Sequence, residues 1–172
     1  MKFRTPSSLT AVPIALFGAA LTWSGCLPEP NFPDEPLITF QSFDLTPGGG
    51  RELVIGFSDG DGNVGLAQGD TLAPFCPACE HHQNLKCEYQ EWRDTAWVEI
   101  GLNPGAGQIP FYYRVPPAAP TGQNPAQSGT IAIDMNSWYL NSAYDSMRFR
   151  IQLFDRDLNA SNQVFTPGTL KP

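Results

Sequence analysis

The sequence has little positive charge, few histidines and no familiar catalytic motif. Lys and Arg total 10 against 17 Asp and Glu, which gives a formal net charge of −7. Phosphate repulsion makes nucleic acid an unexpected partner for so acidic a chain. The two histidines are His81 and His82, and neither a G-x-S-x-G nor an H-E-x-x-H motif occurs. We therefore predict that the chain is not an enzyme.

The chain also lacks long helical periodicity and internal repeats. No apolar pattern is long enough for the helices of βαβ units, and no solenoid period is visible. The 17 prolines and 16 glycines are scattered without a period, which excludes collagen and favours a loop-rich all-β domain. The roughly 146 residues after Cys26 are enough for one domain with its own core.

The start of the chain has the pattern of a bacterial lipoprotein signal peptide. Lys2 and Arg4 precede a mostly apolar stretch at residues 9–21, and small residues lead to Cys26. Such a segment is removed and is too short to be a membrane span. We predict that Cys26 is lipidated, with palmitate among its acyl chains, and that it anchors the protein in the bacterial outer membrane. Because Trp23 replaces the usual Leu, an ordinary secretory peptide is the alternative.

The sequence divides into a signal peptide at 1–25, a tether at 26–36 and one domain at 37–172. Residues 27–36 contain four prolines and three acidic residues, a composition typical of a stiff, extended linker. Short runs of period-two alternation follow, clearest at residues 147–154. The expected strands lie at 37–43, 51–57, 86–92, 96–100, 111–115, 130–135, 147–154 and 163–166. We predict an antiparallel, immunoglobulin-like β-sandwich of about seven or eight strands.

Three segments are similar to parts of a known group of proteins. They are residues 57–66 (FSDGDGNVGL), residues 113–116 (YRVP) and residues 149–162 (FRIQLFDRDLNASN). On these segments the chain resembles small lipoproteins of Bacteroidota that carry an immunoglobulin-like or fibronectin-like β-sandwich. The resemblance implies a fold and an envelope location rather than an activity. The cysteine-rich segment around residues 76–87 departs from the pattern.

Two acidic turns, each directly after an expected strand, could hold calcium. Their oxygen-bearing residues are Asp59, Asp61, Asn63 and Asp70 in the first, and Asp155, Asp157 and Asn159 in the second. Such spacing can wrap Ca²⁺, and the turns could share one ion if both strands end at the same pole. A true EF-hand is not expected, because Val64 replaces its glycine. The alternative is a pair of ordinary turns in which Arg156 pairs with Asp59 or Asp61.

A second group of candidate ligands comprises Cys76, Cys79, His81, His82 and Cys87. Their types are compatible with a Cys₃His zinc site. In an oxidising envelope, however, a disulfide with one spare thiol is favoured, and a bridge from Cys87 to Cys76 or Cys79 would pin the long loop to the sheet. A redox role for the C-x-x-C pair is the remaining option, although no βαβ context surrounds it.

The leading functional expectation is a non-enzymatic accessory or structural lipoprotein that docks on another envelope protein. Edge strands of the sandwich offer a docking mode. The first alternative is a carbohydrate-binding or adhesive module with Ca²⁺-stabilised loops, whose exposed glycan-binding surface includes Trp138 and Tyr139. The second is a zinc or redox protein built on Cys76, Cys79 and Cys87.

Overall fold

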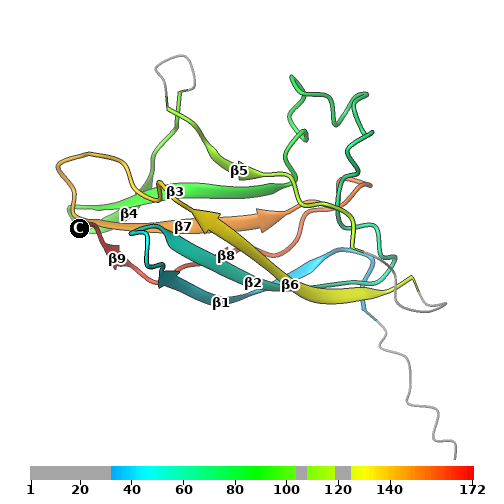
Figure 1. Cartoon of the computed structure of the whole chain (residues 1–172), viewed down its shortest axis with the longest axis horizontal. Helices are drawn as coiled ribbons and strands as arrows, with labels where there is room; N and C mark the ends of the chain where they lie inside the picture. Colours follow the sequence, from blue (N-terminus) through cyan, green and yellow to red (C-terminus); the bar gives the residue numbers. More distant parts are fainter. Residues whose placement is uncertain (1–31, 104–107, 119–124) are drawn as a thin grey trace, which may run out of the picture.

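The computed structural model describes residues 32–103, 108–118 and 125–172, and these residues form nine β-strands. The strands make two antiparallel sheets that face each other, as Figure 1 shows. The predicted antiparallel β-sandwich is thereby confirmed. The predicted signal peptide and Cys26 lie outside the described residues. Among the described residues, no helix has the length and apolar character needed to cross a membrane.

The smaller sheet has the strand order β1-β2-β6. Its strands are β1 (Leu37–Leu45), β2 (Arg51–Asp59) and β6 (Gln127–Met135). Leu53 and Ile55, at alternate positions of β2, are completely buried and turn one face of this sheet toward the core. The β1–β2 connection contains Gly49 at a φ of 82°, a conformation that glycine adopts without steric cost.

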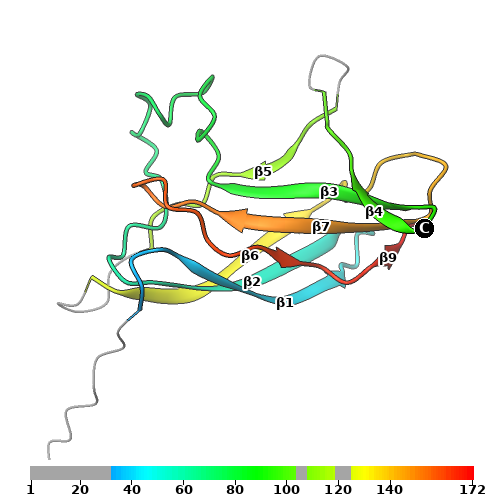
Figure 2. The same ribbon diagram turned by 180° about the vertical axis from the view of Figure 1, so that it is seen from behind.

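The larger sheet is centred on β3 (Leu85–Arg93) and β7 (Ser146–Leu153), which pair along most of their length. Its other strands are β4 (Ala96–Glu99), β5 (Phe111–Tyr113), β8 (Val164–Phe165) and β9 (Thr169–Leu170). Figure 2 shows β3 and β7 side by side from behind. As the alternation predicts, every second residue of β7 from Met147 to Leu153 is fully buried.

Trp138 lies in the core, so its prediction as part of an exposed binding surface is wrong. Only 2% of the residue is exposed, and its Nε1 donates a hydrogen bond to the carbonyl of Gly49 at 3.2 Å. Its ring meets Phe43 edge-to-face at a centroid distance of 6.0 Å. The segment after β6 therefore turns Trp138 inward to close one end of the core. Its neighbour Tyr139 remains 39% exposed, as predicted.

Candidate functional site

The two acidic turns meet at one pole of the sandwich. Asp59 is the last residue of β2, and Asp155 follows the end of β7 in the opposite sheet. One carboxylate oxygen from each of Asp59, Asp61 and Asp155 lies within 4.8 Å of the others. Asp59 and Asp155 are completely buried. We call these three residues the acidic cluster; it joins the ends of strands from both sheets.

Each turn is built around its first aspartate. Asp59 Oδ2 accepts hydrogen bonds from the backbone N–H groups of Asn63 at 2.8 Å and Val64 at 3.3 Å. Asp155 accepts bonds from both the backbone N–H and the side-chain amide of Asn159, each at 2.8 Å. Asp residues commonly satisfy loop N–H groups in this way where a strand ends. The shared Asp-to-Asn spacing of the two turns therefore has a structural cause.

Asn63 connects the two turns. Its Nδ2 donates to Asp61 Oδ2 at 2.8 Å and to Asp157 Oδ2 at 2.9 Å. Asp157 belongs to the second turn, so this amide bridges carboxylates that are nearly a hundred residues apart in the chain. Of the predicted calcium ligands, the structure thus brings together Asp59, Asp61, Asn63, Asp155 and Asp157, with Asn159 supporting Asp155.

The electrostatics of the acidic cluster are unfavourable to its negative charge. Burial raises the pKa of Asp59 to about 6; the backbone N–H of Asn63 opposes this rise, and the charge of Asp61 adds to it. Burial also raises the pKa of Asp155, although hydrogen bonds from Asn159 offset part of the effect. None of the ion pairs between described residues includes a member of the cluster.

Asp70 does not join the acidic cluster, and Arg156 does not neutralise it. Arg156 forms a bidentate salt bridge with Asp70, with Nη1 at 2.6 Å from Oδ2 and Nη2 at 3.2 Å from Oδ1. Asp70 Oδ2 also accepts the backbone N–H of Ala67 at 2.7 Å. Arg156 is the main cause of the lowered pKa of Asp70. Asp70 as a calcium ligand and Arg156 as the partner of Asp59 or Asp61 are therefore both incorrect.

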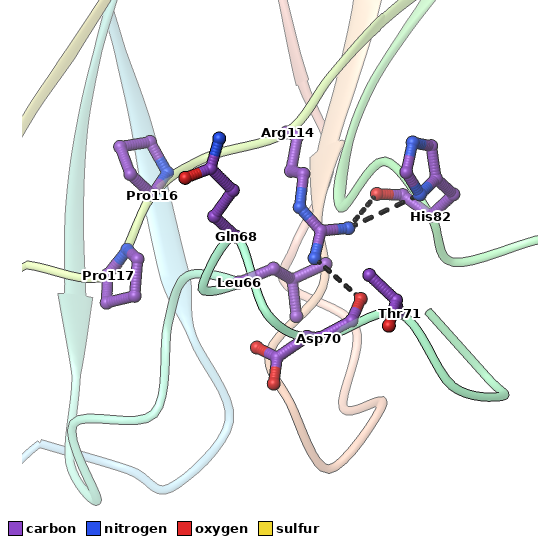
Figure 3. A pocket seen from close by; sticks show the side chains of 8 residues that line it. All are labelled: Leu66, Gln68, Asp70, Thr71, His82, Arg114, Pro116 and Pro117. Carbon is purple, nitrogen blue, oxygen red and sulfur yellow. Dashed lines mark hydrogen bonds between the residues drawn. The ribbon is translucent and has the colours of Figure 1, made fainter. Parts of the chain in front are cut away.

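Arg114 organises the loop beside this pole, as Figure 3 shows. Its guanidinium donates to the backbone carbonyl of His82 at 2.6 Å and to those of Ala67 and Asp70 at 2.9 Å each. The adjoining hollow of about 380 Å³ is also lined by Pro116. Because Arg114 is occupied by carbonyl groups, it holds the loop rather than offering a free anion site. Sequence reasoning missed this role, since backbone acceptors leave no residue pattern.

The cysteine group does not form the predicted zinc site. Cys76 pairs with Cys79 and Cys87 is the free thiol, so the favoured disulfide with one spare cysteine is present; it closes within the loop and does not join the loop to the sheet through Cys87. Cys87 is 1% exposed within β3, and burial raises the pKa of its thiol far above the usual value. His82 Nδ1 instead lies 3.1 Å from the carbonyl of Phe75, and the His81 ring packs against Phe154. The five residues therefore do not converge on one point.

Gly62 shapes the first acidic turn and provides a test of its packing. Its φ is +70°, and a Cβ at this position would lie 1.8 Å from the carbonyl oxygen of Pro125. We expect Gly62→Ala to lower the free energy of unfolding by about 2 kcal/mol, since a left-handed backbone and a backbone clash both oppose a side chain. Denaturant titration of the variant and of the unmodified chain measures this difference in the free energy of unfolding. Gly48→Ala is the matched control, because nothing lies within 4 Å of its Cβ position; equal stability of the two variants would contradict the described turn.

No protein-family model, curated protein or solved structure matches the chain.

Proposed function

We propose that the chain is a non-enzymatic envelope lipoprotein that docks, through the free edge of β6, on an extended segment of another envelope protein. The observation that carries this proposal is the open edge of β6 beside an apolar groove. The signal-peptide pattern ending at Cys26 supports the envelope location and the lipid anchor. The lack of a recognisable catalytic motif in the sequence is consistent with a binding role.

The two sides of the sandwich differ in how they are closed. On one side, the Asn162 side chain accepts the backbone N–H of Ile38 at 2.8 Å and donates to its carbonyl at 2.9 Å. These two bonds attach β1 to the segment before β8, so the sheets are joined there. On the other side, β6 pairs along all nine residues with β2 and, among the described residues, with no other strand. No strand among the described residues pairs with its outer edge, which could therefore take a strand from a partner.

Two hollows with predominantly apolar surface, here together called the groove, lie along this edge. The groove consists of one hollow of about 550 Å³ and another of about 290 Å³, in each of which residues of β6 face the chain segment around β5. The lining includes Ile109, Phe111, Met135 and Tyr139 in the first, and Val115, Pro117, Ile131 and Ala132 in the second. Ile109 is 82% exposed. An apolar lining beside an open edge suits side chains that project from an added strand.

The strand itself has few of the features that prevent edge-to-edge pairing. Its sequence, QSGTIAIDM, contains no proline and a single charged residue, Asp134. A partner chain added to β6 would gain main-chain hydrogen bonds from the edge and specificity from the groove. The occupant that fits is thus an extended, mainly apolar segment of a second protein.

The test is a pull-down of the tagged full-length chain from gently solubilised membranes. Ala132 is exposed on β6, and Ala132→Lys places a charged side chain at the groove; Ala96→Lys is the matched change on exposed β4. We expect a stoichiometric partner with the unmodified chain and with Ala96→Lys, and at least a tenfold loss with Ala132→Lys, because burying an unpaired charge is costly. Cys26→Ala should also lose the partner if the anchor brings the two together.

Hydrogen exchange of the recovered complex locates the contact. We expect the amides on the outer edge of β6 to exchange more slowly in the complex than in the free chain. A partner that survives Ala132→Lys, or a complex without protection in β6, would contradict docking at this edge.

A further inference from the structure

We propose that the acidic cluster of Asp59, Asp61 and Asp155 is a Ca²⁺ site that fastens the two sheets together at one pole. The site lies at the strand ends, whereas the proposed docking edge runs along β6. The inference is therefore independent of the proposed function.

The first observation is uncompensated charge. The three carboxylates place oxygens within 4.8 Å of one another, and two of these residues are completely buried. Repulsion between like charges is strong where water is excluded. Arg156, which follows Asp155 directly in the chain, is held in its bidentate contact with Asp70. A bound cation would supply the positive charge that the described side chains around the cluster do not.

The second observation is a buried oxygen that lacks a hydrogen-bond donor. Oδ2 of Asp59 accepts two backbone N–H groups, but its Oδ1 is buried and has no partner among the described residues. Oδ1 of Asn63, in the same turn, is likewise buried without a partner. Buried polar atoms are nearly always satisfied in folded proteins, and each exception calls for a bound ion, water or other explanation. Both orphaned atoms here are oxygens, which are the ligands of hard cations.

The chemistry of the donors favours calcium over other metals. The cluster and its neighbours Asn63 and Asp157 offer only carboxylate and amide oxygens, without nitrogen or sulfur. Ca²⁺ takes six to eight oxygen ligands in variable geometry and is often held by loops, with waters completing the shell. Mg²⁺ requires a tighter octahedron and keeps its waters, so irregular turns such as these suit it less well.

The position of the ion gives it a structural effect. Asp59 ends β2 in the smaller sheet, and Asp155 follows β7 in the larger one. A single Ca²⁺ held by both carboxylates would connect the sheets at this pole. An ion that binds only the folded arrangement stabilises the fold increasingly as the Ca²⁺ concentration rises above the Kd.

Thermal unfolding of the full-length chain in detergent tests the proposal. With CaCl₂ at saturation we expect Tm to rise by roughly 5 °C or more relative to excess EDTA, with a smaller rise in MgCl₂. Calorimetric titration with CaCl₂ should show a single class of site. An unchanged Tm between CaCl₂ and EDTA, or an equal rise in MgCl₂, would overturn the calcium assignment.

Asp59→Asn separates ion binding from simple packing. The amide keeps the shape of the carboxylate and an acceptor for the loop N–H groups while removing one charge from the cluster. In EDTA we expect this variant to be at least as stable as the unmodified chain, since repulsion is relieved, and its calcium-dependent rise in Tm should disappear. Glu52→Gln is the matched control, because it removes the same charge from an exposed position of the same strand; it should retain the full rise. A variant that loses stability equally with and without calcium would show that Asp59 has only a packing role.

Discussion

Replacing Trp138 with alanine is expected to remove about 4 kcal/mol of the free energy of unfolding. The side chain is 2% exposed and fills the end of the core between the two sheets. It contacts Phe43 edge-to-face, and the guanidinium carbon of Arg51 lies 4.6 Å from the centre of its ring. Its loss therefore leaves a large cavity and also breaks the hydrogen bond to Gly49. Since natural domains are stable by only about 5–15 kcal/mol, the variant should be close to unfolding at 37 °C.

Tyr139→Ala is the control for this prediction. Tyr139 follows Trp138 in the chain but is 39% exposed, so its replacement should cost only about 0.5–1 kcal/mol. Urea titration followed by tryptophan fluorescence or circular dichroism measures both variants. Equal, small effects at the two positions would mean that Trp138 is exposed after all, and would restore its prediction as a surface residue.

Replacing Glu91 with glutamine is expected to lower the free energy of unfolding by about 3 kcal/mol. The Glu91 side chain is 1% exposed and lies 2.7 Å from Arg93 and 3.5 Å from Lys171. Ser142 donates a hydrogen bond to the same carboxylate, and Lys171 also donates to the Ser142 hydroxyl at 2.8 Å. The amide would leave Lys171, which is only 7% exposed, without its counterion. Breaking a buried pair in this way is much costlier than removing an exposed one.

Acidic pH should reproduce the effect of the Glu91 substitution. Burial alone would raise the pKa of Glu91, but the hydrogen bonds from Ser142 and Arg93 and the charge of Lys171 outweigh it, so the pKa lies below its usual value. The carboxylate therefore stabilises the fold above the pKa of the unfolded chain, and this contribution is lost as the pH falls through the lower folded value. The stability difference between the unmodified chain and Glu91→Gln should narrow below about pH 4.

Glu99→Gln is the matched control in the same sheet. Glu99 pairs with Arg150 at 2.6 Å, but its side chain is 43% exposed. Exposed pairs contribute about 0.2–1 kcal/mol, and we expect a change within that range. A Glu91→Gln variant that is no less stable than Glu99→Gln would contradict the role assigned to the buried network.

The strands were predictable where one side of the sheet is buried. Residues of β7 alternate between buried and partly exposed. Apolar and polar residues therefore alternate in its sequence, and this alternation identifies the strand. The same rule could have placed Cys87 inside, since it alternates with Leu85 and Tyr89 in β3, and so could have excluded its disulfide to the loop. Trp138 was harder, because it lies in an irregular segment where no period indicates which side chains turn inward.

The acidic cluster was partly predictable for a similar reason. Both turns follow strands and have the same Asp-x-Asp-x-Asn spacing, so their meeting needed only that β2 and β7 end at one pole. The contact between Asp70 and Arg156 joins residues 86 positions apart, and no local pattern specifies such a pairing. The Arg114 contacts with carbonyl groups were likewise invisible, because backbone acceptors are the same at every residue.

The double hydrogen bond between Asn162 and Ile38 has a mechanical consequence. Ile38 is the second residue of β1, so the chain enters the sandwich where these two hydrogen bonds join the two sheets. Just before it, the carbonyl of Pro33 accepts the backbone N–H of Gly60. A force applied through the preceding residues would reach these bonds and the β1–β2 ladder together, so several bonds would share the load. Resistance to forced unfolding depends on the unfolding rate rather than on equilibrium stability. The first strand of the domain is thus reinforced at its point of entry, which would suit the lipid anchor proposed above, because pulling on that anchor would load this strand first.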